Sequence, residues 1–479
     1  MSTATKILAE TAEDTNALNK SSGGTGHLKR VLGLRSLLSV AIGLVVTQGV
    51  MVLALQGLGI AGIGFFIAMA IAFVLALFAA FSFAELSLMM PRAGTLSTYT
   101  QVAIGQFPAI VATFSGYVVV AMFAVAAELQ LIGLILSEIF PNFLSPMALG
   151  LLILGIFAVL NIVGVDIFAK LQTVLAFTMV VSISVLGAAA ILGTNEPQLS
   201  NLDLFSDWNP IGTEVFSLIA LAIWLFVGAE FVCPLVEETK NPEKNIPKAM
   251  FYGLFTILGV YLLFCIGAFF YMPLEQMASS SLPHLDYAVA VFGDSGLEVL
   301  AIVAITATCS TVNTTLASVP RMLYGMAKNK QAFPIFKRLD SRFNTPAIAI
   351  LFMAAIIGAP LIILGDKPDT VVILLIAAST CWLLAYIISH IDVIVLRKRM
   401  PDANRPFKTP FYPIPQVLGI IGMGYAAYYN SPSPELTQQV FLTAGAVLAV
   451  VSVIAALWVK LYMKKDLFQP ESMEDVLKG

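Results

Sequence analysis

Long apolar segments recur along the whole chain and are separated by short polar segments. A segment of about 18 or more apolar residues is typical of a helix that crosses a membrane. Hydrophobic residues make up 58% of the chain and charged residues 11%, whereas a soluble domain has about 25% charged residues. The pattern predicts an all-α membrane protein with 12 transmembrane helices, at residues 36–58, 60–88, 107–138, 145–164, 169–193, 213–236, 249–272, 295–320, 346–365, 370–396, 412–430 and 436–461.

The basic residues predict how these helices are oriented. When the segments are threaded across a membrane in order, every Lys and Arg except Lys367 falls on one side. Basic residues accumulate in cytoplasmic loops, so we expect a plasma (inner) membrane protein with both termini in the cytoplasm. We expect a cytosolic tail over 1–35, a permease domain over 36–461 and a second cytosolic tail over 462–479. A miscounted helix would have scattered the basic residues over both sides.

Two of the predicted helices contain residues that interrupt a helix. Gly43 and the run Thr47-Gln48-Gly49 interrupt the first, and Gly228 interrupts the sixth. Such residues are tolerated in hydrocarbon where the backbone lines a cavity, because lipid cannot bond to the freed N–H and C=O groups. The alternative is that the glycines only let helices pack closely.

The spacing of the interruptions suggests an internal symmetry. Interrupted helices five segments apart are what an inverted repeat would produce, with a first repeat over 36–193, a second over 213–396, and helices 11 and 12 (412–461) outside it. The N-terminus of a half-helix attracts an anion and its C-terminus attracts a cation. An amino acid carries both an anionic carboxylate and a cationic ammonium group.

Glu85, Glu128 and Glu230 are acids within apolar segments. A lone carboxylate at mid-depth costs roughly 2.5 to 3.5 kcal/mol on insertion scales. The only Lys or Arg within the spans, Lys170 and Lys460, lie at span ends, so Glu128 and Glu230 must be protonated, hydrated or paired with something from outside. For Glu128 the alternative is a neutral acid bonded to a neighbouring helix. Glu85, at a cytoplasmic helix end, is interpreted as structural.

The sequence does not indicate catalysis. It has no Gly-rich phosphate loop, no HExxH and no nucleophile elbow on a plausible element, so we expect no enzyme, no metal, no cofactor and no nucleic-acid partner. His390 and Asp392 are interpreted as interfacial anchors and not as an acyltransferase pair. The four cysteines lie in apolar segments without metal-ligand spacing, and we expect free buried thiols. The tails are too short for a signalling domain.

Four stretches resemble conserved segments of one known family. They are FAELSLMMPRAGTLSTY (83–99), EETKNPEKNIPKAM (237–250), VPRMLYGMAKNKQAFPIFKRLDSRFNTPAIAI (319–350) and RKRMPDANRPFKTPFYPIP (397–415). The chain resembles the amino acid/polyamine/organocation (APC) permeases. The resemblance implies the five-plus-five inverted-repeat (LeuT-like) fold with broken helices 1 and 6. It also implies secondary transport of an amino acid by alternating access, or, alternatively, import or antiport of a polyamine or small organic amine.

The resemblance also implies a substrate site. In the family the break in helix 1 usually reads G-S/A-G and its amides hold the substrate carboxylate; here the bulkier Gln48 could instead bond to the substrate itself. The W-x-F-x-G-x-E spacing from Trp224 to Glu230 is similar to that of antiporters in which the tryptophan stacks on the substrate as a gate and the glutamate senses protons or contacts the substrate. Phe123 in helix 3, and Ser379 and Thr380 in helix 10, are added by their depth. The expected substrate-binding residues are Thr47, Gln48, Gly49, Phe123, Glu128, Trp224, Phe226, Val227, Gly228, Glu230, Ser379 and Thr380.

The coupling ion is left open by the sequence. Proton-coupled relatives often carry a lysine in helix 5 where this chain has Met179. Ser310, Thr311 and Asn313 could complete a sodium site with helix 1 carbonyls, or could simply bond helices together. Sodium coupling, proton coupling through Glu230 and plain exchange are therefore alternatives, and the expected partners are a small amino acid or amine, H+ or Na+, and membrane lipid.

Overall fold

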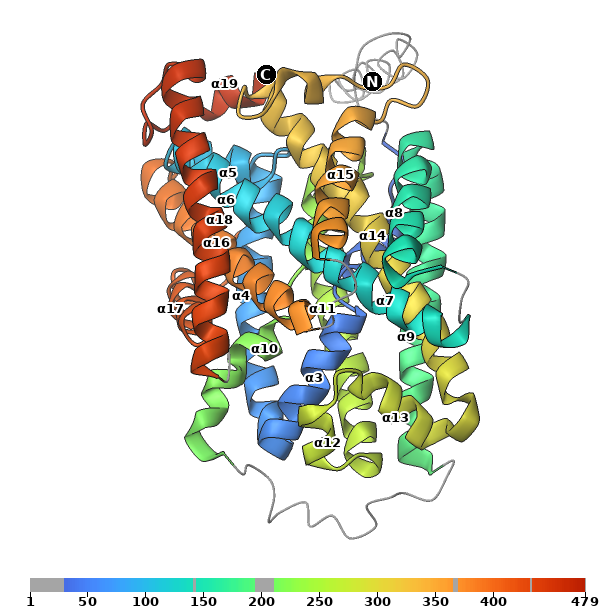
Figure 1. Cartoon of the computed structure of the whole chain (residues 1–479). Helices are drawn as coiled ribbons and strands as arrows, with labels where there is room; N and C mark the ends of the chain where they lie inside the picture. The colour runs from blue at the N-terminus through green and yellow to red at the C-terminus, as the bar shows by residue number, and fades with distance from the viewer. Residues whose placement is uncertain (1–29, 141–143, 194–210, 365–368, 431–432, 479) are drawn as a thin grey trace, which may run out of the picture.

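The computed structural model describes residues 30–140, 144–193, 211–364, 369–430 and 433–478. Over these residues the chain is a bundle of helices, most of which run along one axis (Figure 1). One end carries α5 and α19 and is called the α19 end; the opposite end carries α12 and is called the α12 end. Lys367, the one basic residue expected outside, lies outside the described residues.

The principal helices follow the predicted segments. They are α2 (Leu34–Gly43), α3 (Gln48–Ala61), α4 (Phe65–Met89), α6 (Gln106–Thr113), α7 (Ala126–Ile139), α8 (Pro146–Val163), α9 (Val165–Leu192), α10 (Ile219–Ile223), α11 (Pro242–Tyr271), α14 (Gly296–Lys328), α15 (Ala347–Leu364), α16 (Asp369–Arg399), α17 (Ile414–Tyr428) and α18 (Pro434–Leu457). In the described part of the chain, eight helical stretches are long and apolar enough to cross a membrane, and four shorter apolar helices accompany them. One of the eight, Gln48–Met89, contains both α3 and α4.

Several short helices lie where loops were expected. They are α5 (Leu96–Ala103), α12 (Leu274–Ser279), α13 (Pro283–Phe292) and α19 (Met473–Lys478). These segments are too short or too polar to give the long apolar signal that marks a membrane helix. The structure therefore adds helices at both ends of the bundle without changing the predicted order of the long ones.

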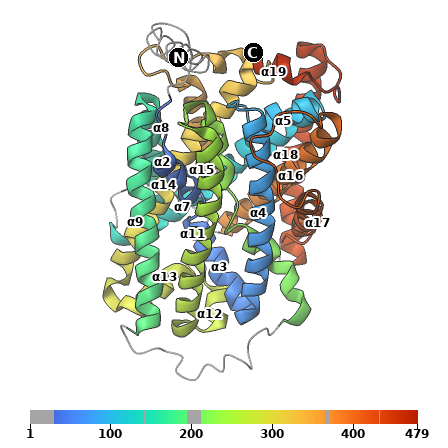
Figure 2. The same ribbon diagram turned by 180° about the vertical axis from the view of Figure 1, so that it is seen from behind.

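Both predicted interruptions coincide with breaks in helical geometry. α2 ends at Gly43 and α3 begins at Gln48, with α2 on the α19 side of α3 (Figure 2). α10 ends at Ile223, and Gly228 has a φ of 116°, a left-handed conformation that glycine adopts without strain. A 3₁₀ helix, η5 (Ala229–Glu238), follows and contains Pro234. The chain thus leaves regular α-helix at both places.

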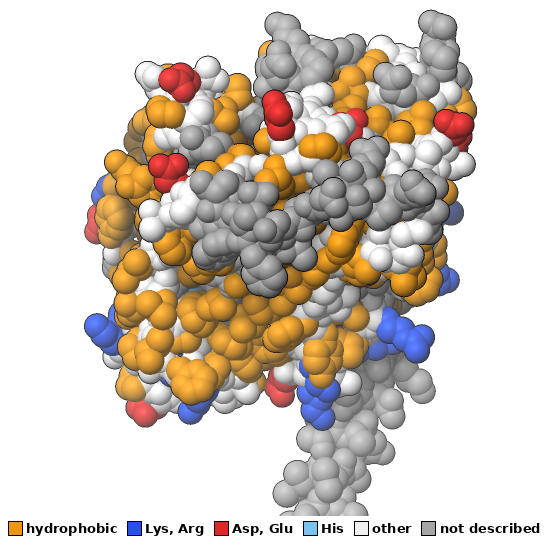
Figure 3. Space-filling model, turned by 90° about the horizontal axis from the view of Figure 1, so that it is seen from below, with side chains coloured by type: hydrophobic (Ala, Val, Ile, Leu, Met, Phe, Trp, Pro, Cys, Tyr) orange, Lys and Arg blue, Asp and Glu red, His pale blue; other side chains and the backbone are white. Residues whose placement is uncertain are grey.

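The outer faces of the bundle are apolar. Phe177 of α9 is 70% exposed, and Val453 of α18 is 59% exposed. Seen from the α12 end, hydrophobic side chains spread over much of the surface and charged side chains are scattered singly (Figure 3). Such a surface suits hydrocarbon, in which exposed apolar side chains cost nothing. The four cysteines are buried and free, as predicted.

The N-terminal end of α2 is joined to the end of η5 through the main chain. The N–H groups of Val31 and Leu32 both donate to the carbonyl oxygen of Glu238, at 2.9 Å each. The N–H of Lys240 donates to the carbonyl oxygen of Leu32 at 2.8 Å. These three bonds connect the two interrupted stretches, residues 34–61 and 219–238, at the α19 end.

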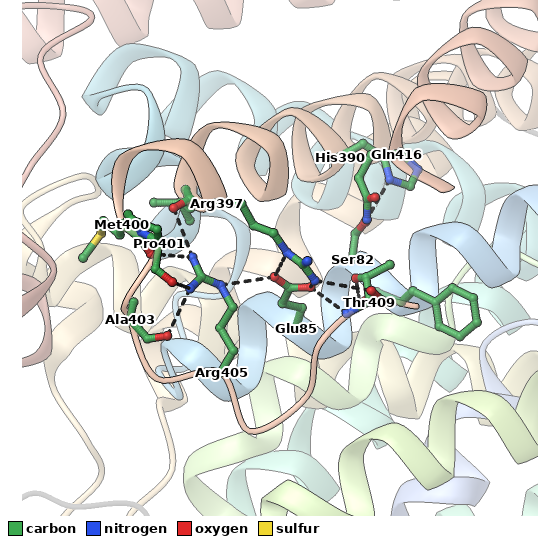
Figure 4. Close-up of polar contacts among 12 residues, drawn as sticks. Ser82, Glu85, His390, Arg397, Met400, Pro401, Ala403, Arg405, Thr409 and Gln416 are labelled. Carbon is green, nitrogen blue, oxygen red and sulfur yellow. Dashed lines mark hydrogen bonds and ion pairs between the residues drawn. The ribbon is translucent and has the colours of Figure 1, made fainter. Parts of the chain in front are cut away.

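Glu85 anchors the long loop after α16 to α4 (Figure 4). Its carboxylate accepts hydrogen bonds from Arg397, at 2.7 and 2.8 Å, and from the N–H of Thr409 at 2.8 Å. Arg405 Nε lies 3.3 Å from the same carboxylate. The structural interpretation of Glu85 fits this arrangement.

Replacing Glu85 with glutamine should destabilise the protein, because two guanidinium groups lose their anion. Hydrogen bonds to charged groups contribute about 1.5 to 3 kcal/mol, and we expect a loss of about 2 kcal/mol. The thermal unfolding midpoint in detergent micelles measures it. Asp466→Asn, which removes an ion pair on an exposed acid, is the control and should leave the midpoint unchanged; an equal midpoint for both variants would contradict the role.

His390 and Asp392 are not interfacial anchors, which corrects the expectation from the sequence. Both side chains are fully buried. His390 Nδ1 lies 2.9 Å from Ser82 Oγ, which also accepts a bond from Gln416, and Asp392 accepts from Thr100 Oγ1 at 2.6 Å. The error arose because polar residues near a helix end were assumed to reach water, whereas α4, α5 and α17 cover this part of α16.

Candidate functional site

A cavity lies beside both helix interruptions. Its walls come from the two breaks and from the segments around α7, α14 and α16. Most of the wall is aliphatic or aromatic, and polar groups are few. The described residues that line it are Leu44, Val45, Thr47, Val50, Val120, Ala121, Ala124, Val125, Glu128, Trp224, Val227, Phe231, Thr311, Thr315, Leu375 and Trp382.

The N-terminus of α3 is capped by side chains of the protein itself. Glu128 Oε2 accepts the N–H of Gln48 at 3.0 Å, and Glu128 Oε1 accepts the N–H of Gly49 at 2.7 Å. Thr47 Oγ1 accepts the N–H of Val50 at 3.2 Å. A helix leaves its first N–H groups without partners inside the helix, and here the first three are satisfied. The carboxylate is stabilised by these bonds and by the positive end of the helix.

Gln48 and Gly49 are fixed by the same arrangement. The side chain of Gln48 is fully buried and its Nε2 donates to Thr308 Oγ1 on α14 at 2.6 Å. A Cβ at Gly49 would lie 2.8 Å from Glu128 Oε1 and 2.9 Å from Leu375 Cδ1. The glycine therefore lets the carboxylate approach the backbone, and Gln48 ties the break to α14 and does not line the cavity.

Glu230 holds the second interruption together. Its Oε2 accepts the N–H of Gly228 at 3.1 Å and the hydroxyl of Tyr386, and its Oε1 accepts the indole N–H of Trp382 at 2.8 Å. Tyr386 also accepts the N–H of Gly228 at 3.0 Å. The carboxylate thus joins the left-handed turn at Gly228 to α16.

Protonation, hydration or pairing from outside was expected for Glu128 and Glu230, and of these the described residues bear only on pairing. Each carboxylate accepts hydrogen bonds from donors within the chain. The sequence reasoning searched for Lys and Arg, whereas the actual donors are backbone N–H groups, an indole and a hydroxyl. Backbone N–H groups become available only because the helices are interrupted nearby.

Only part of the predicted substrate site meets at the cavity. Thr47, Glu128, Trp224 and Val227 line it. Trp224 is 5% exposed, and its indole N–H has no partner among the described residues. The predicted residues that do not line the described cavity are Gln48, Gly49, Phe123, Phe226, Gly228, Glu230, Ser379 and Thr380.

Phe123 does not line the described cavity, whereas Val120, Ala121, Ala124, Val125 and Glu128 of the same helical stretch do. Its place in the substrate site stays a prediction. Two π-helical turns, Phe114–Val119 and Ala121–Val125, shift the register of this helix.

Phe226 and Thr380 contact neighbouring segments on the side away from the described cavity. The ring of Phe226 packs edge to face on Phe73 of α4, with centroids 5.5 Å apart. Thr380 Oγ1 donates to the carbonyl of Ile376 at 3.0 Å and accepts from Asn430 at 3.4 Å, so it faces away from the cavity toward residues that follow α17. Ser379 is buried at 6% exposure.

Sequence reasoning missed Trp382 and Tyr386. Trp382 lines the cavity and its ring lies 5.4 Å from that of Trp224, at 89°. The signal that could have found these residues is the W-x-x-x-Y spacing in α16, which places two hydrogen-bonding aromatic side chains on one face of a helix.

The three residues of the predicted ion site lie on two sides of α14. Thr311 lines the cavity and donates to the carbonyl of Gly43 at 3.4 Å. Ser310 and Asn313 instead bond to Gln172 of α9, at 2.7 and 3.0 Å. Gln172 also donates to the carbonyl of Ser39 at 3.1 Å. This amide therefore links α2, α9 and α14.

The fold is a helical bundle with apolar outer faces, and a cavity lies where two of its helices are interrupted. These features define an integral membrane protein of the transporter type. Comparison with known families is consistent with this class. The model of the amino acid permease family matches residues 32–457, and the chain belongs to this family.

Relatives of known name cover most of the chain. It is 26% identical over 430 residues to the branched-chain amino acid permease BcaP of Bacillus subtilis, covering 83% of this chain and 87% of the relative. It is 26% identical over 415 residues to the serine/threonine exchanger SteT of the same organism, covering 82% and 90%. It is 25% identical over 397 residues to the human cystine/glutamate transporter, covering 81% and 77%.

Proposed function

We propose that this protein is a secondary transporter that moves an amino acid across the membrane by alternating access. The observation that carries the proposal is the cavity, which Thr47 and Val227 line at the two places where the backbone leaves regular helix. Ligand sites of transporters lie where discontinuous helices meet near mid-membrane. The names of the relatives, a permease, an exchanger and a transporter of amino acids, support the same activity.

We further propose twelve membrane-spanning helices, arranged as an inverted repeat of residues 36–193 and 213–396 with α17 and α18 outside it. The two interruptions support this arrangement, since they occupy corresponding positions in the two halves. The basic residues support a plasma (inner) membrane location with both termini in the cytoplasm. Exchange, proton coupling and sodium coupling are distinguished by the experiment below.

Counterflow in proteoliposomes tests the proposed function. Liposomes containing the purified protein and loaded with one unlabelled amino acid should accumulate the labelled form of that amino acid, and the assay is run with and without sodium and a pH gradient. A panel covering aliphatic, polar and acidic amino acids and amines in which no ligand exchanges would overturn the proposal.

Trp224→Ala should lower this exchange about tenfold or more, because buried aromatic anchors often contribute 2 kcal/mol or more to binding. The indole lines the cavity and has an unpaired N–H among the described residues. Trp458→Ala is the matched control, since Trp458 Nε1 donates to the carbonyl of Lys330 at the α19 end. Equal effects of the two substitutions would argue against a role of Trp224 in binding.

A further inference from the structure

The outer surface of α9 changes from apolar to basic toward the α19 end. Val174, Phe177 and Val181 are 62%, 70% and 42% exposed. Lys170, one turn before Val174, is also exposed. Because these positions are three or four residues apart, they form one stripe on the helix surface. The exposed apolar stripe of α9 therefore ends in a lysine.

The outer surface of α11 shows the same change. Tyr252 and Phe255 are 55% and 56% exposed, and the exposed Lys248 and Lys244 precede Tyr252 at intervals of four residues. Tyrosine is enriched where hydrocarbon meets the lipid headgroups. The two lysines lie beyond this tyrosine, at the depth of the headgroups.

α2 lies between these two helices at the same end (Figure 2). Gln172 of α9 donates to the carbonyl of Ser39 in α2 at 3.1 Å. On the other side of α2, a Cβ at Gly253 of α11 would lie 3.0 Å from the Cβ of Ala41. Arg35, one turn before Ser39, is exposed. The first half of an interrupted helix thus adds its own cation to those of α9 and α11.

Positive charge predominates where the three helices begin. Their charged residues all lie within the first seven residues of each helix. These residues are Arg35 in α2, Asp166 and Lys170 in α9, and Glu243, Lys244 and Lys248 in α11. Four are cations and two are anions, and the positive ends of the helix dipoles add to the excess. This surface attracts an anion.

An anionic phospholipid matches both parts of the surface. Its phosphate suits the basic side chains, and its acyl chains suit the apolar stripes below them. Packed helices lie about 8 to 10 Å apart, and the long Lys and Arg side chains can extend over such a gap toward one group. Basic pockets between transmembrane helices on the cytoplasmic side are a known means of holding anionic headgroups. A soluble anion would use only the charges.

We propose that one anionic phospholipid binds over α2, where α2 lies between α9 and α11. Its phosphate pairs with Arg35, Lys170 and Lys248, and its acyl chains lie on the apolar stripes of α9 and α11. The lipid joins the first half of the interrupted helix to its two neighbours from the membrane side. This binding does not depend on the proposed transport activity, so each proposal can fail without the other.

Competition between two lipids tests the proposal. Purified full-length protein in uncharged detergent micelles is mixed with equal amounts of phosphatidylglycerol and phosphatidylcholine that carry the same acyl chains. Native mass spectrometry then measures which lipid the protein retains. Phosphatidylglycerol should be retained about tenfold or more over phosphatidylcholine, because each Lys or Arg near an anionic lipid favours its binding. Equal retention of the two lipids would overturn the proposal.

A phosphate without acyl chains tests whether the site takes a lipid. Glycerol 3-phosphate carries a phosphate but cannot cover the apolar stripes. Added in equal amount, it should leave the retained phosphatidylglycerol unchanged. Displacement of the lipid by this soluble compound would show that the surface recognises a free phosphate, and would overturn the assignment to a lipid.

Substitution of the lysines tests the position of the site. Lys170→Gln combined with Lys248→Gln should lower retention of phosphatidylglycerol about tenfold or more. The matched control is Lys337→Gln combined with Lys398→Gln, which removes two exposed lysines from η7 (Pro334–Lys337) and α16. The control should retain the lipid as the unchanged protein does. An equal loss in both double variants would show attraction to net charge alone and would overturn the site.

The thermal unfolding midpoint checks that the double variants fold. All four substituted side chains are exposed, so without added lipid the midpoints should equal that of the unchanged protein. Phosphatidylglycerol should then raise the midpoint of the unchanged protein and of the control, because a ligand stabilises the state that binds it. An equal rise in the variant that lacks Lys170 and Lys248 would contradict the proposed site.

Discussion

Replacing Glu230 with alanine should abolish measurable exchange and lower the free energy of unfolding by about 3 kcal/mol or more, since an unsatisfied buried donor costs about 1 to 3 kcal/mol. Two donors, the indole of Trp382 and the hydroxyl of Tyr386, would lose their acceptor, and the N–H of Gly228 would keep only the Tyr386 oxygen. Trp382 would also lose the bond that orients its ring against Trp224 and Phe231, with centroids 5.4 and 5.6 Å away. Counterflow and the thermal midpoint measure the two effects.

Tyr386→Phe is the matched comparison for this experiment. It removes one donor to Glu230 and one acceptor for Gly228 but keeps the carboxylate and its bond to Trp382. We expect a smaller loss of stability, about 1 kcal/mol, the usual contribution of one hydrogen bond. If Glu230→Ala were no more harmful than Tyr386→Phe, Glu230 would not be the group that holds the turn in place.

Arg321→Ala should destabilise the protein by about 3 to 5 kcal/mol, because breaking a buried ion pair leaves an uncompensated charge. Arg321 and Glu238 form a bidentate pair between α14 and η5, and their side chains are 1% and 2% exposed. Arg321 also donates to the carbonyl of Ala317 at 2.6 Å. The expected result is a large fall in the unfolding midpoint.

A double substitution separates the effect of losing the ion pair from the effect of leaving one buried charge without its partner. Arg321→Met combined with Glu238→Leu removes both charges and keeps apolar volume, and such replacements are often neutral or stabilising. The midpoint of the double variant should therefore lie well above that of either single variant. A double variant as unstable as the sum of both singles would contradict the pairing, since independent sites add.

The positions of the long helices could be predicted because hydrocarbon demands long apolar segments. The interruptions could be predicted for the same reason, since Gly43, Thr47 and Gly228 interrupt a helix and lipid cannot hydrogen-bond to the backbone groups that an interruption leaves free. Glu85 was interpreted as structural from its place in a segment shared with the resembled family, and the structure pairs it with Arg397 and Arg405.

The partners of buried groups could not be predicted. Glu128 and Gln48 are 80 residues apart, and only the packing of α7 against α3 brings the carboxylate to the helix terminus. Phe123 was chosen by depth, but depth does not say which face of a helix meets the cavity. Trp382 was missed because a tryptophan in an apolar helix gives the same signal whether it faces lipid or a ligand.

The main-chain bonds between residues 31–32 and 238–240 have a practical consequence for protein engineering. A purification tag fused ahead of residue 30 leaves those bonds intact, whereas trimming the chain through Gly33 deletes both donors to the Glu238 carbonyl and the acceptor of the Lys240 N–H. The shortened protein would lose the main-chain bonds between the two interrupted stretches and keep only the packing of α2 against η5. Truncated versions prepared for crystallisation should therefore begin no later than Arg30.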